Sequence, residues 1–179
     1  MDEQKLSTLQ RWLGVAKRVV FFGGAGVSTE SGIPDFRSRD GLYNRKNRKF
    51  SHYKPEYLLS YDCLAHRPET FFEYFRENLD CRSALPNDAH RKLAEMEEKG
   101  KLDGVITQNI DGLHQRAGSR KVWEIHGSAL RSYCTGCHKE YGPDFIFDLV
   151  IINKGRTKME GKADLVFHDS IGKILQSGS

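Results

Sequence analysis

The sequence predicts an α/β fold with a Rossmann-like parallel sheet. Two short apolar runs, at residues 18–22 and 102–107, are too short for helices and rich enough in β-branched or aromatic residues to be buried strands, and another short apolar segment spans residues 122–125. A glycine-rich turn follows the first run, as in nucleotide-binding folds. Amphipathic helical segments lie between the first two runs, which favours a sheet with helices packed against it.

The length and the charge balance favour one domain over residues 1–179. The chain has 28 Lys and Arg against 24 Asp and Glu, a net charge of +4 that suits an ordinary solvated surface better than a nucleic-acid partner. Since no apolar run is long enough to cross a bilayer and no signal-like segment opens the chain, we expect a cytoplasmic protein without a membrane partner. Its four cysteines are then expected to be reduced.

The first predicted element is an amphipathic helix over residues 3–16. Leu6, Leu9, Trp12 and Leu13 recur at helical spacing, so they form one apolar stripe. The strand at residues 18–22 comes next and leads directly into the glycines.

The glycine-rich turn has the sequence GGAGVSTES at residues 23–31. Glycines let the backbone approach a ligand closely, and a helix start after a strand favours an anion, so the turn predicts a phosphate cradle. The residues expected to cap the following helical turn are Ser28, Thr29 and Ser31. The third glycine of the usual dinucleotide fingerprint is missing, and a purely structural turn is the alternative. The sequence Ile33-Pro34-Asp35-Phe36-Arg37 suits a loop that folds over a ligand.

A basic and aromatic run at residues 40–54 is interpreted as a surface loop, because no nucleic-acid module accompanies it. Helices are expected at residues 55–60, at 68–80 with Pro68 in the first turn, and at 88–99 with Asn87 as the cap. The apolar stripe of the second of these helices comprises Phe71, Phe72, Phe75 and Leu79, and it is predicted to belong to the core. Cys63 and Cys81 are predicted to be small buried side chains.

Polar residues follow the second strand and the apolar segment at residues 122–125. Gln108-Asn109-Ile110-Asp111 comes after residues 102–107, at the edge where open parallel sheets bind ligands. A polar turn that caps the next helix is the alternative. His126 follows the apolar segment, and its residue type suits a general base at neutral pH, although a lone histidine is more often structural.

Three motifs together resemble one family. GAGVSTESGIPDFRS, TQNIDGLH at residues 107–114 and EIHG at residues 124–127 look like the sirtuins, bacterial type, which are NAD-dependent protein deacylases. The resemblance implies NAD as cofactor and acetylated or acylated lysine in proteins as substrate. It implies that the residues binding NAD are Gly24, Ala25, Gly26, Thr29, Asp35, Phe36, Arg37, Gln108, Asn109, Ile110, Asp111, Asn153, Lys154 and Ile171.

The resemblance also implies roles at the site. His126 would be the catalytic histidine, which activates a ribose hydroxyl after nicotinamide has left, and the products would be free lysine and an O-acyl-ADP-ribose. Asn109 and Asp111 would hold the ribose and the nicotinamide amide, while Phe36 and Arg37 would help close the site. The parts at residues 40–100 and 128–147 would be insertions that form a small helical and zinc-ribbon module.

Cys134 and Cys137 form a C-x-x-C motif, which is half of a four-cysteine zinc ribbon. No cysteine follows Cys137, so the second pair that sirtuins carry is absent and zinc binding is put in doubt. His138 or His168 would replace a thiolate only if the fold brought it near. A redox role for the motif is not favoured, since the thioredoxin context is missing.

An internal segment is also absent near residues 147 and 148. In sirtuins that segment supplies the second cysteine pair, the strand that binds the acyl-lysine and a glycine-threonine-serine turn for the cofactor phosphates. Residues 148–155 resemble the last nucleotide-binding strand, so the sheet is expected to be incomplete. Two hypotheses follow: an NAD-dependent protein deacylase, or a catalytically inactive remnant that binds NAD weakly or binds a protein.

Overall fold

A computed structural model describes residues 2–45, 47–148, 150–152, 154–157, 160–170 and 173. The chain divides into two compact units, the N-terminal unit Met1–Leu130 and the C-terminal unit Arg131–Ser179. The described helices include none that is long and apolar enough to cross a membrane. The single domain predicted from the sequence stays a prediction.

The N-terminal unit is built on a parallel sheet of three strands, in the order β1-β2-β3. β1 is Val20–Gly23, β2 is Gly104–Thr107 and β3 is Val122–Glu124. β1 and β2 lie where the sequence predicts strands, and β3 lies in the apolar segment at residues 122–125. The register pairs Phe22 with Ile106 and Ile106 with Trp123. The α/β fold with a Rossmann-like parallel sheet is confirmed.

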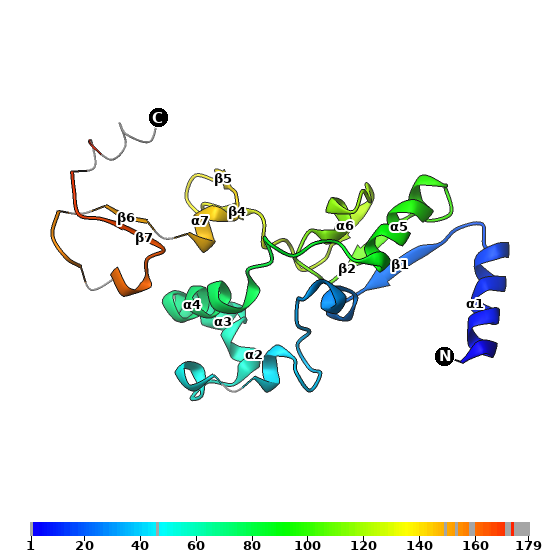
Figure 1. The fold of residues 1–179 in the computed structure, drawn as a ribbon, viewed down its shortest axis with the longest axis horizontal. Helices are drawn as coiled ribbons and strands as arrows, with labels where there is room; N and C mark the ends of the chain where they lie inside the picture. Colours follow the sequence, from blue (N-terminus) through cyan, green and yellow to red (C-terminus); the bar gives the residue numbers. More distant parts are fainter. Residues whose placement is uncertain are drawn as a thin grey trace. The chain divides into compact units, whose positions relative to one another are not determined.

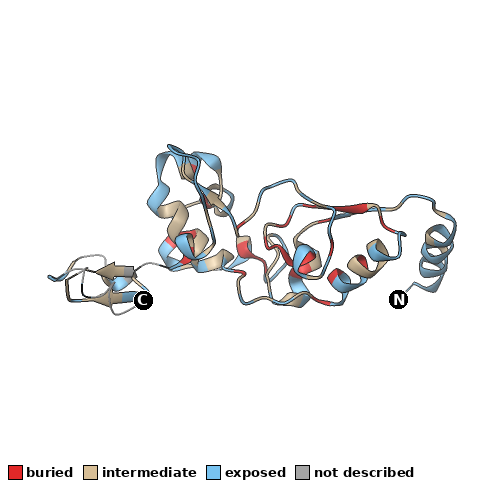
Figure 2. Cartoon of the chain, turned by 90° about the horizontal axis from the view of Figure 1, so that it is seen from above, coloured by how far each residue is buried: buried red, intermediate tan, exposed pale blue. Residues whose placement is uncertain are grey.

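Helix α5 (Asp88–Glu98) covers the inner face of this sheet (Figures 1 and 2). Leu93 of the helix packs with Leu102 and Val105, and Val105 is completely buried. The helix begins where the sequence predicts, because the Asn87 side chain accepts hydrogen bonds from the backbone N–H groups of Ala89 and His90. The same Asn87 donates to the carbonyl of Val27, which ties the helix to the turn after β1.

Three further helices belong to the N-terminal unit: α2 (Pro55–Leu58), α3 (Tyr61–His66) and α4 (Pro68–Leu79). Phe50 and Tyr74 meet edge to face, 5.1 Å between ring centroids, and form a second apolar cluster with Leu58. Pro68 stands in the first turn of α4 as predicted, whereas α3 was not predicted as a separate helix. Cys63 in α3 is completely buried, so its predicted character as a buried side chain is confirmed.

The other face of the sheet is exposed. Val20, Phe22 and Trp123 are 54%, 61% and 54% exposed, and the strand register places Ile106 between Phe22 and Trp123. We call Val20, Phe22, Ile106 and Trp123 the open face of the sheet. Parallel sheets normally bury both faces, so this face is an unusual apolar surface.

Helix α1 (Glu3–Val15) confirms the predicted N-terminal helix. The Asp2 side chain caps it by accepting a hydrogen bond from the backbone N–H of Lys5 at 3.1 Å. None of its residues is buried, as the colouring of the N-terminal helix in Figure 2 shows. Trp12 in its apolar stripe is 61% exposed.

The C-terminal unit contains two small sheets. β4 (Ser132–Tyr133) and β5 (Glu140–Tyr141) form an antiparallel hairpin, followed by α7 (Asp144–Phe147). β6 (Val150–Ile152) pairs in parallel with β7 (Leu165–Phe167), with the short helical turn η4 (Glu160–Lys162) between them. The strand expected within residues 148–155 is therefore present, but in the described residues it pairs with β7 and not with the β1-β2-β3 sheet.

Candidate functional site

The candidate site lies where the three strands of the N-terminal unit end. The turn after β1, the residues after β2 and His126 after β3 line one open cavity of about 1420 Å³. Ligand pockets commonly measure about 300–1,000 Å³, so this cavity has room for a large ligand. The prediction that polar residues gather at the carboxyl edge of the sheet is thus met in the geometry.

The turn after β1 is a 3-10 helix, η1 (Ala25–Ser31), with Gly24 as its N-cap residue and no side-chain cap. The prediction that Ser28, Thr29 and Ser31 cap a helical turn is wrong, because all three lie inside η1. Gly24 lies close to Gln108, since an added Cβ would come within 3.3 Å of the Gln108 Oε1. The turn ends at Gly32, whose positive φ of 82° suits glycine.

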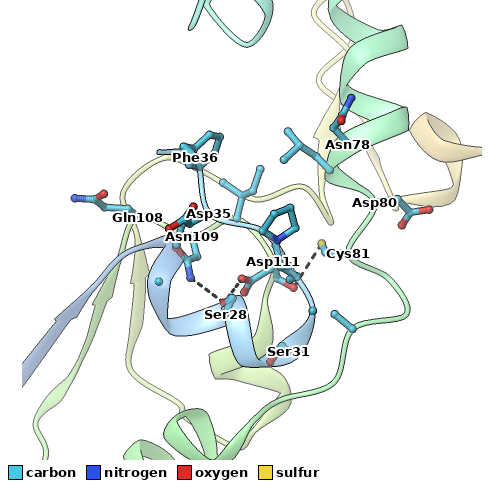
Figure 3. Close-up of a pocket in the computed structure, with 18 of the residues that line it drawn as sticks. Ser28, Ser31, Asp35, Phe36, Asn78, Asp80, Cys81, Gln108, Asn109 and Asp111 are labelled. Atoms are coloured by element: carbon cyan, nitrogen blue, oxygen red, sulfur yellow. Dashed lines mark hydrogen bonds between the residues drawn. The ribbon is translucent and has the colours of Figure 1, made fainter. Parts of the chain in front are cut away.

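A buried hydrogen-bond network joins the turn to the residues after β2 (Figure 3). The Ser28 hydroxyl donates to Asp111 Oδ2 at 2.6 Å and accepts from the Asn109 side-chain amide at 2.9 Å. The other oxygen of Asp111 accepts from the backbone N–H of Leu113 at 2.9 Å. All three polar residues are at most 8% exposed, so the network fixes the two strand ends relative to each other. The role of Ser28 could not be predicted from local sequence patterns, because the contact joins residues 83 positions apart.

His126 is exposed at the cavity, and its ring is oriented by one hydrogen bond. Its Nδ1 lies 3.1 Å from the backbone carbonyl of Gln108. A carbonyl oxygen only accepts, so Nδ1 carries the proton in the neutral ring and Nε2 keeps its lone pair. This tautomer suits a general base. Gly127, with a positive φ of 80°, turns the chain directly after the histidine.

Backbone hydrogen bonds join the two ends of the loop from Asp35 to Asn44. The backbone N–H groups of Leu42 and Tyr43 donate to the carbonyls of Asp35 and Phe36 at 2.8 and 2.9 Å. Gly41 makes this possible, since an added Cβ would lie 2.6 Å from the Asp35 carboxylate and 2.8 Å from the Phe36 backbone. The Phe36 and Tyr43 rings pack 5.3 Å apart, and both residues line the cavity.

Helix α4 forms another part of the cavity wall. Phe71, Phe75 and Leu79 are half-buried, four residues apart along α4, and they line the cavity. The prediction that this stripe belongs to the core is wrong; in α4 only Tyr74 is buried. Helical spacing alone does not distinguish a core from an apolar cavity wall, because both bury one face of the helix.

Cys81 and a histidine pair lie near the network. Burial, together with the charge of Asp111, raises the pKa of the Cys81 thiol to about 11, which leaves it protonated and confirms its predicted buried character. His90 and His114 pack edge to face with ring centroids 4.7 Å apart, and both are essentially inaccessible to solvent. Burial lowers the pKa of His114 to about 4 and also lowers that of His90. The sequence did not single out this pair, whose members lie 24 positions apart.

The cavity brings together most of the residues predicted to bind NAD. Those that line it are Ala25, Gly26, Asp35, Phe36, Arg37, Gln108, Asn109, Ile110 and Asp111, together with His126. Gly24 and Thr29 are not in the lining; the Thr29 hydroxyl donates back to the Gly26 carbonyl at 2.9 Å. Lys154 is an exposed residue of the C-terminal unit, and Asn153 and Ile171 lie outside the described residues.

The C-x-x-C motif lies in the C-terminal unit, at the tip of the β4-β5 hairpin. The backbone N–H groups of Cys137 and Gly136 donate to the Cys134 thiol and lower its pKa. The described residues contain no group of three or more His, Cys, Asp and Glu that could hold a metal ion. Neither His138 nor His168 therefore completes a site there. Two thiolates alone do not fit the four-ligand zinc site of a zinc ribbon.

A model of the Sir2 family matches residues 24–164. The chain belongs to the Sir2 family. Among similar proteins, an NAD-dependent protein deacetylase of Clostridium perfringens (strain 13 / Type A) is 38% identical over 243 aligned positions that span 98% of each chain. An NAD-dependent protein deacetylase of Clostridium tetani (strain Massachusetts / E88) is 48% identical over 148 residues, which cover 83% of this chain and 58% of that one.

Solved Sir2 structures share the fold. A structure described as Sir2 with a p53 peptide and NAD+ matches with a TM-score of 0.65 and 26% identity over 97% of this chain and 98% of its own. One described as Sir2 bound to acetylated peptide matches with a TM-score of 0.66, also at 26% identity, over the same shares. The resemblance to sirtuins is thus confirmed. The alignment with the Clostridium perfringens protein has 243 positions and this chain has 179 residues, so the chain lacks positions that the Clostridium protein has.

Proposed function

We propose that this chain is an NAD-dependent protein deacetylase that acts on acetylated lysine in proteins. Its Sir2 family membership and its relatives named NAD-dependent protein deacetylase support the activity. The observation that carries the proposal is the convergence of the turn after β1, the Gln108–Asp111 segment and His126 on one cavity. A phosphate-binding turn, polar groups for a ribose and a correctly protonated histidine are what the reaction requires.

One further observation supports the fit of these residues to NAD. The Ser31 hydroxyl is buried beside the cavity and has no hydrogen-bond partner in the described structure, so a ligand group would satisfy it. We assign the phosphates to the turn, including Gly24, Ala25, Gly26 and Thr29. Asn153, Lys154 and Ile171 are proposed for the adenosine side. When bound, NAD supplies the ADP-ribosyl group that receives the acetyl group as nicotinamide leaves.

Each group of the chain has a proposed task. His126 takes a proton from a ribose hydroxyl at Nε2, because Nδ1 is held by the Gln108 carbonyl. Asn109 and Asp111 position the ribose and the nicotinamide amide. Phe36 and Arg37 lie on the loop that Gly41 keeps closed, so they exclude water from the reacting atoms. The half-buried side chains Phe71 and Phe75 supply an apolar wall for an acyl chain.

The test is turnover of an acetylated peptide with and without NAD, with mass spectrometry for the deacetylated peptide and chromatography for nicotinamide. We expect equal amounts of the two products, and a loss on the order of a hundredfold to ten-thousandfold in rate for His126→Ala. NAD binding, measured by calorimetry, should change much less in that variant. Equal activity of His126→Ala would overturn the assignment of the base.

A second function is favoured by the length of the alignment: a catalytically inactive Sir2 remnant that binds NAD. The positions missing from this chain include, by the resemblance, the strand for the acyl-lysine. The same peptide assay on a protein with that segment restored separates the two functions. Activity in the restored form alone, with NAD binding in both, supports the remnant. A cytoplasmic location belongs to the proposal, since NAD must be supplied there, and fractionation of cells tests it.

A further inference from the structure

The basic and aromatic run at residues 40–54 carries the whole net charge of the chain. It contains five Lys and Arg against one Asp, whereas the rest of the chain contains 23 Lys and Arg against 23 Asp and Glu. Of the described residues of this run, only Tyr43 lines the cavity of the candidate site. The candidate site therefore does not account for this concentration of positive charge.

Hydrogen bonds hold the basic run in place. Asn47 caps the short helical turn η3 (Arg48–Phe50), because its side chain accepts from the backbone N–H of Lys49 at 3.0 Å. The Arg45 Nε donates to the backbone carbonyl of Asp40 at 3.2 Å. A surface that is ordered in this way loses little conformational entropy when it binds a partner.

A second pocket, of about 410 Å³, opens in the basic run. Four buried side chains form its apolar floor: Leu42, Phe50, Leu58 and Tyr74. The lining also includes Arg45 and Arg48, both of which are exposed. The pocket thus offers an apolar interior to one bulky side chain and two guanidinium groups to the charges around it.

The two arginines of this pocket have no acidic partner. In the part of the chain that the structure describes, no carboxylate forms an ion pair with Arg45 or Arg48, whereas Lys49 of the same run pairs with Glu73 and Glu77 of α4. A guanidinium group binds a carboxylate through two parallel hydrogen bonds. The charge and the shape of the pocket therefore complement an acidic ligand that carries an apolar group.

The packing of the aromatic rings favours a peptide over a nucleic acid. Phe50 meets Tyr74 edge to face at 5.1 Å between ring centroids, and the Tyr53 ring stacks on Tyr57 at 5.8 Å. Basic and aromatic surfaces that bind single-stranded nucleic acids stack the bases on free ring faces. These rings pack against one another instead, so the pocket suits an apolar side chain better than a base.

We propose that this pocket binds an extended acidic segment of a partner protein. The segment inserts one bulky apolar side chain into the pocket and places its carboxylates against Arg45 and Arg48. In the described structure the pocket and the candidate site share no lining residue, so the interaction does not depend on the deacetylase activity. Because opposite charges attract the segment, binding weakens as the salt concentration rises.

The test measures binding to the full chain by fluorescence anisotropy, without NAD and without an acylated lysine. The probe is a labelled peptide of glutamates around one central phenylalanine. We expect saturable binding that weakens with salt, and a loss of affinity of about tenfold or more when alanine replaces the phenylalanine. A peptide with lysines in place of the glutamates should not bind.

The variants Arg45→Glu and Arg48→Glu should each weaken binding of the acidic peptide by more than about tenfold, since like charges then face each other. Lys101→Glu makes the same change of charge at an exposed position outside the run, so it is the matched control and should bind as the unmodified chain does. Circular dichroism shows whether the variants are folded.

Three results would overturn the proposal. The first is the absence of saturable binding, or equal binding of the glutamate and lysine peptides. The second is unchanged affinity in a folded Arg48→Glu. The third is tighter binding of a labelled single-stranded oligonucleotide than of the acidic peptide at the same salt concentration, which would assign the surface to nucleic acid.

Discussion

The buried histidine pair predicts that the protein loses stability in mild acid. His90 and His114 lie against each other, both close enough to Asp111 to feel its charge, and both nitrogens of His114 lack a hydrogen-bond partner in the described structure. Burial first, and then the neighbouring His90, lower the pKa of His114 from 6.5 to about 4, although Asp111 opposes the shift. The folded state therefore resists a proton that the unfolded chain accepts.

The size of the effect follows from the shift. Because the pKa of His114 is lower in the folded state, the unfolded state binds more protons between about pH 6.5 and about pH 4, and stability falls as the pH falls through that range. One pKa unit corresponds to about 1.4 kcal/mol, so the full shift is worth about 3 kcal/mol. Between about pH 7 and about pH 5 the expected loss from His114 is about 2 kcal/mol. That is a large share of a typical domain stability of about 5–15 kcal/mol.

The assay is urea unfolding at both pH values for the full chain and for His114→Phe. Phenylalanine keeps a ring in the apolar site and removes two unsatisfied nitrogens, so we expect a change below about 2 kcal/mol at neutral pH. In the variant, the decrease in the free energy of unfolding between about pH 7 and about pH 5 should be about 2 kcal/mol smaller than in the unmodified chain. His52→Gln, at an exposed position, serves as the control and should keep the sensitivity of the unmodified chain. The same pH dependence in His114→Phe and in the unmodified chain would refute the reasoning.

Three further predictions concern single positions. Ser28→Ala leaves Asp111 and Asn109 buried without their shared partner. Urea unfolding should therefore show a free energy of unfolding lower by about 1–3 kcal/mol, and calorimetry should show weaker NAD binding. Unchanged values for both would contradict the role of the network. Gly41→Ala forces the loop open and should weaken NAD binding, whereas the control Gly14→Ala, with no atom within 4 Å of the added Cβ, should not. Phe22→Thr on the open face should reduce binding of a hydrophobic dye with little loss of stability. Phe21→Thr on the inner face should be strongly destabilising. Equal losses of stability in the two variants would mean that the open face is covered in solution.

Much of the framework was predictable because its signals are local. Asn87 before α5, Pro68 at the start of α4 and the glycines after β1 each act within a few residues of their position. The strand ends were predictable as a group, since parallel strands present their carboxyl ends at one edge. His126 was predictable from its residue type and its place after β3, and its tautomer required the structure.

The remaining features depend on contacts between distant parts of the chain. Serine is a residue type that often caps helices, and only the fold shows that the Ser28 side chain instead contacts Asp111. The α4 stripe has the period of a core helix, and only the position of the cavity shows which side it lines. The close approach of Gly41 to Asp35 and the pairing of β6 with β7 likewise depend on contacts that form only when the chain folds.

The two faces of the β1-β2-β3 sheet separate the site from the apolar surface that the chain leaves exposed. The strand ends are held by the inner face, where Val105 packs against Leu93, and by the network around Ser28. The open face carries Phe22 and Trp123 and contributes neither of them to the cavity lining. Exposed apolar surface lowers the stability of the folded state and promotes association, but it does not move groups that other contacts fix. NAD binding should therefore scale with the folded fraction, and the geometry around His126 should be the same in every folded molecule.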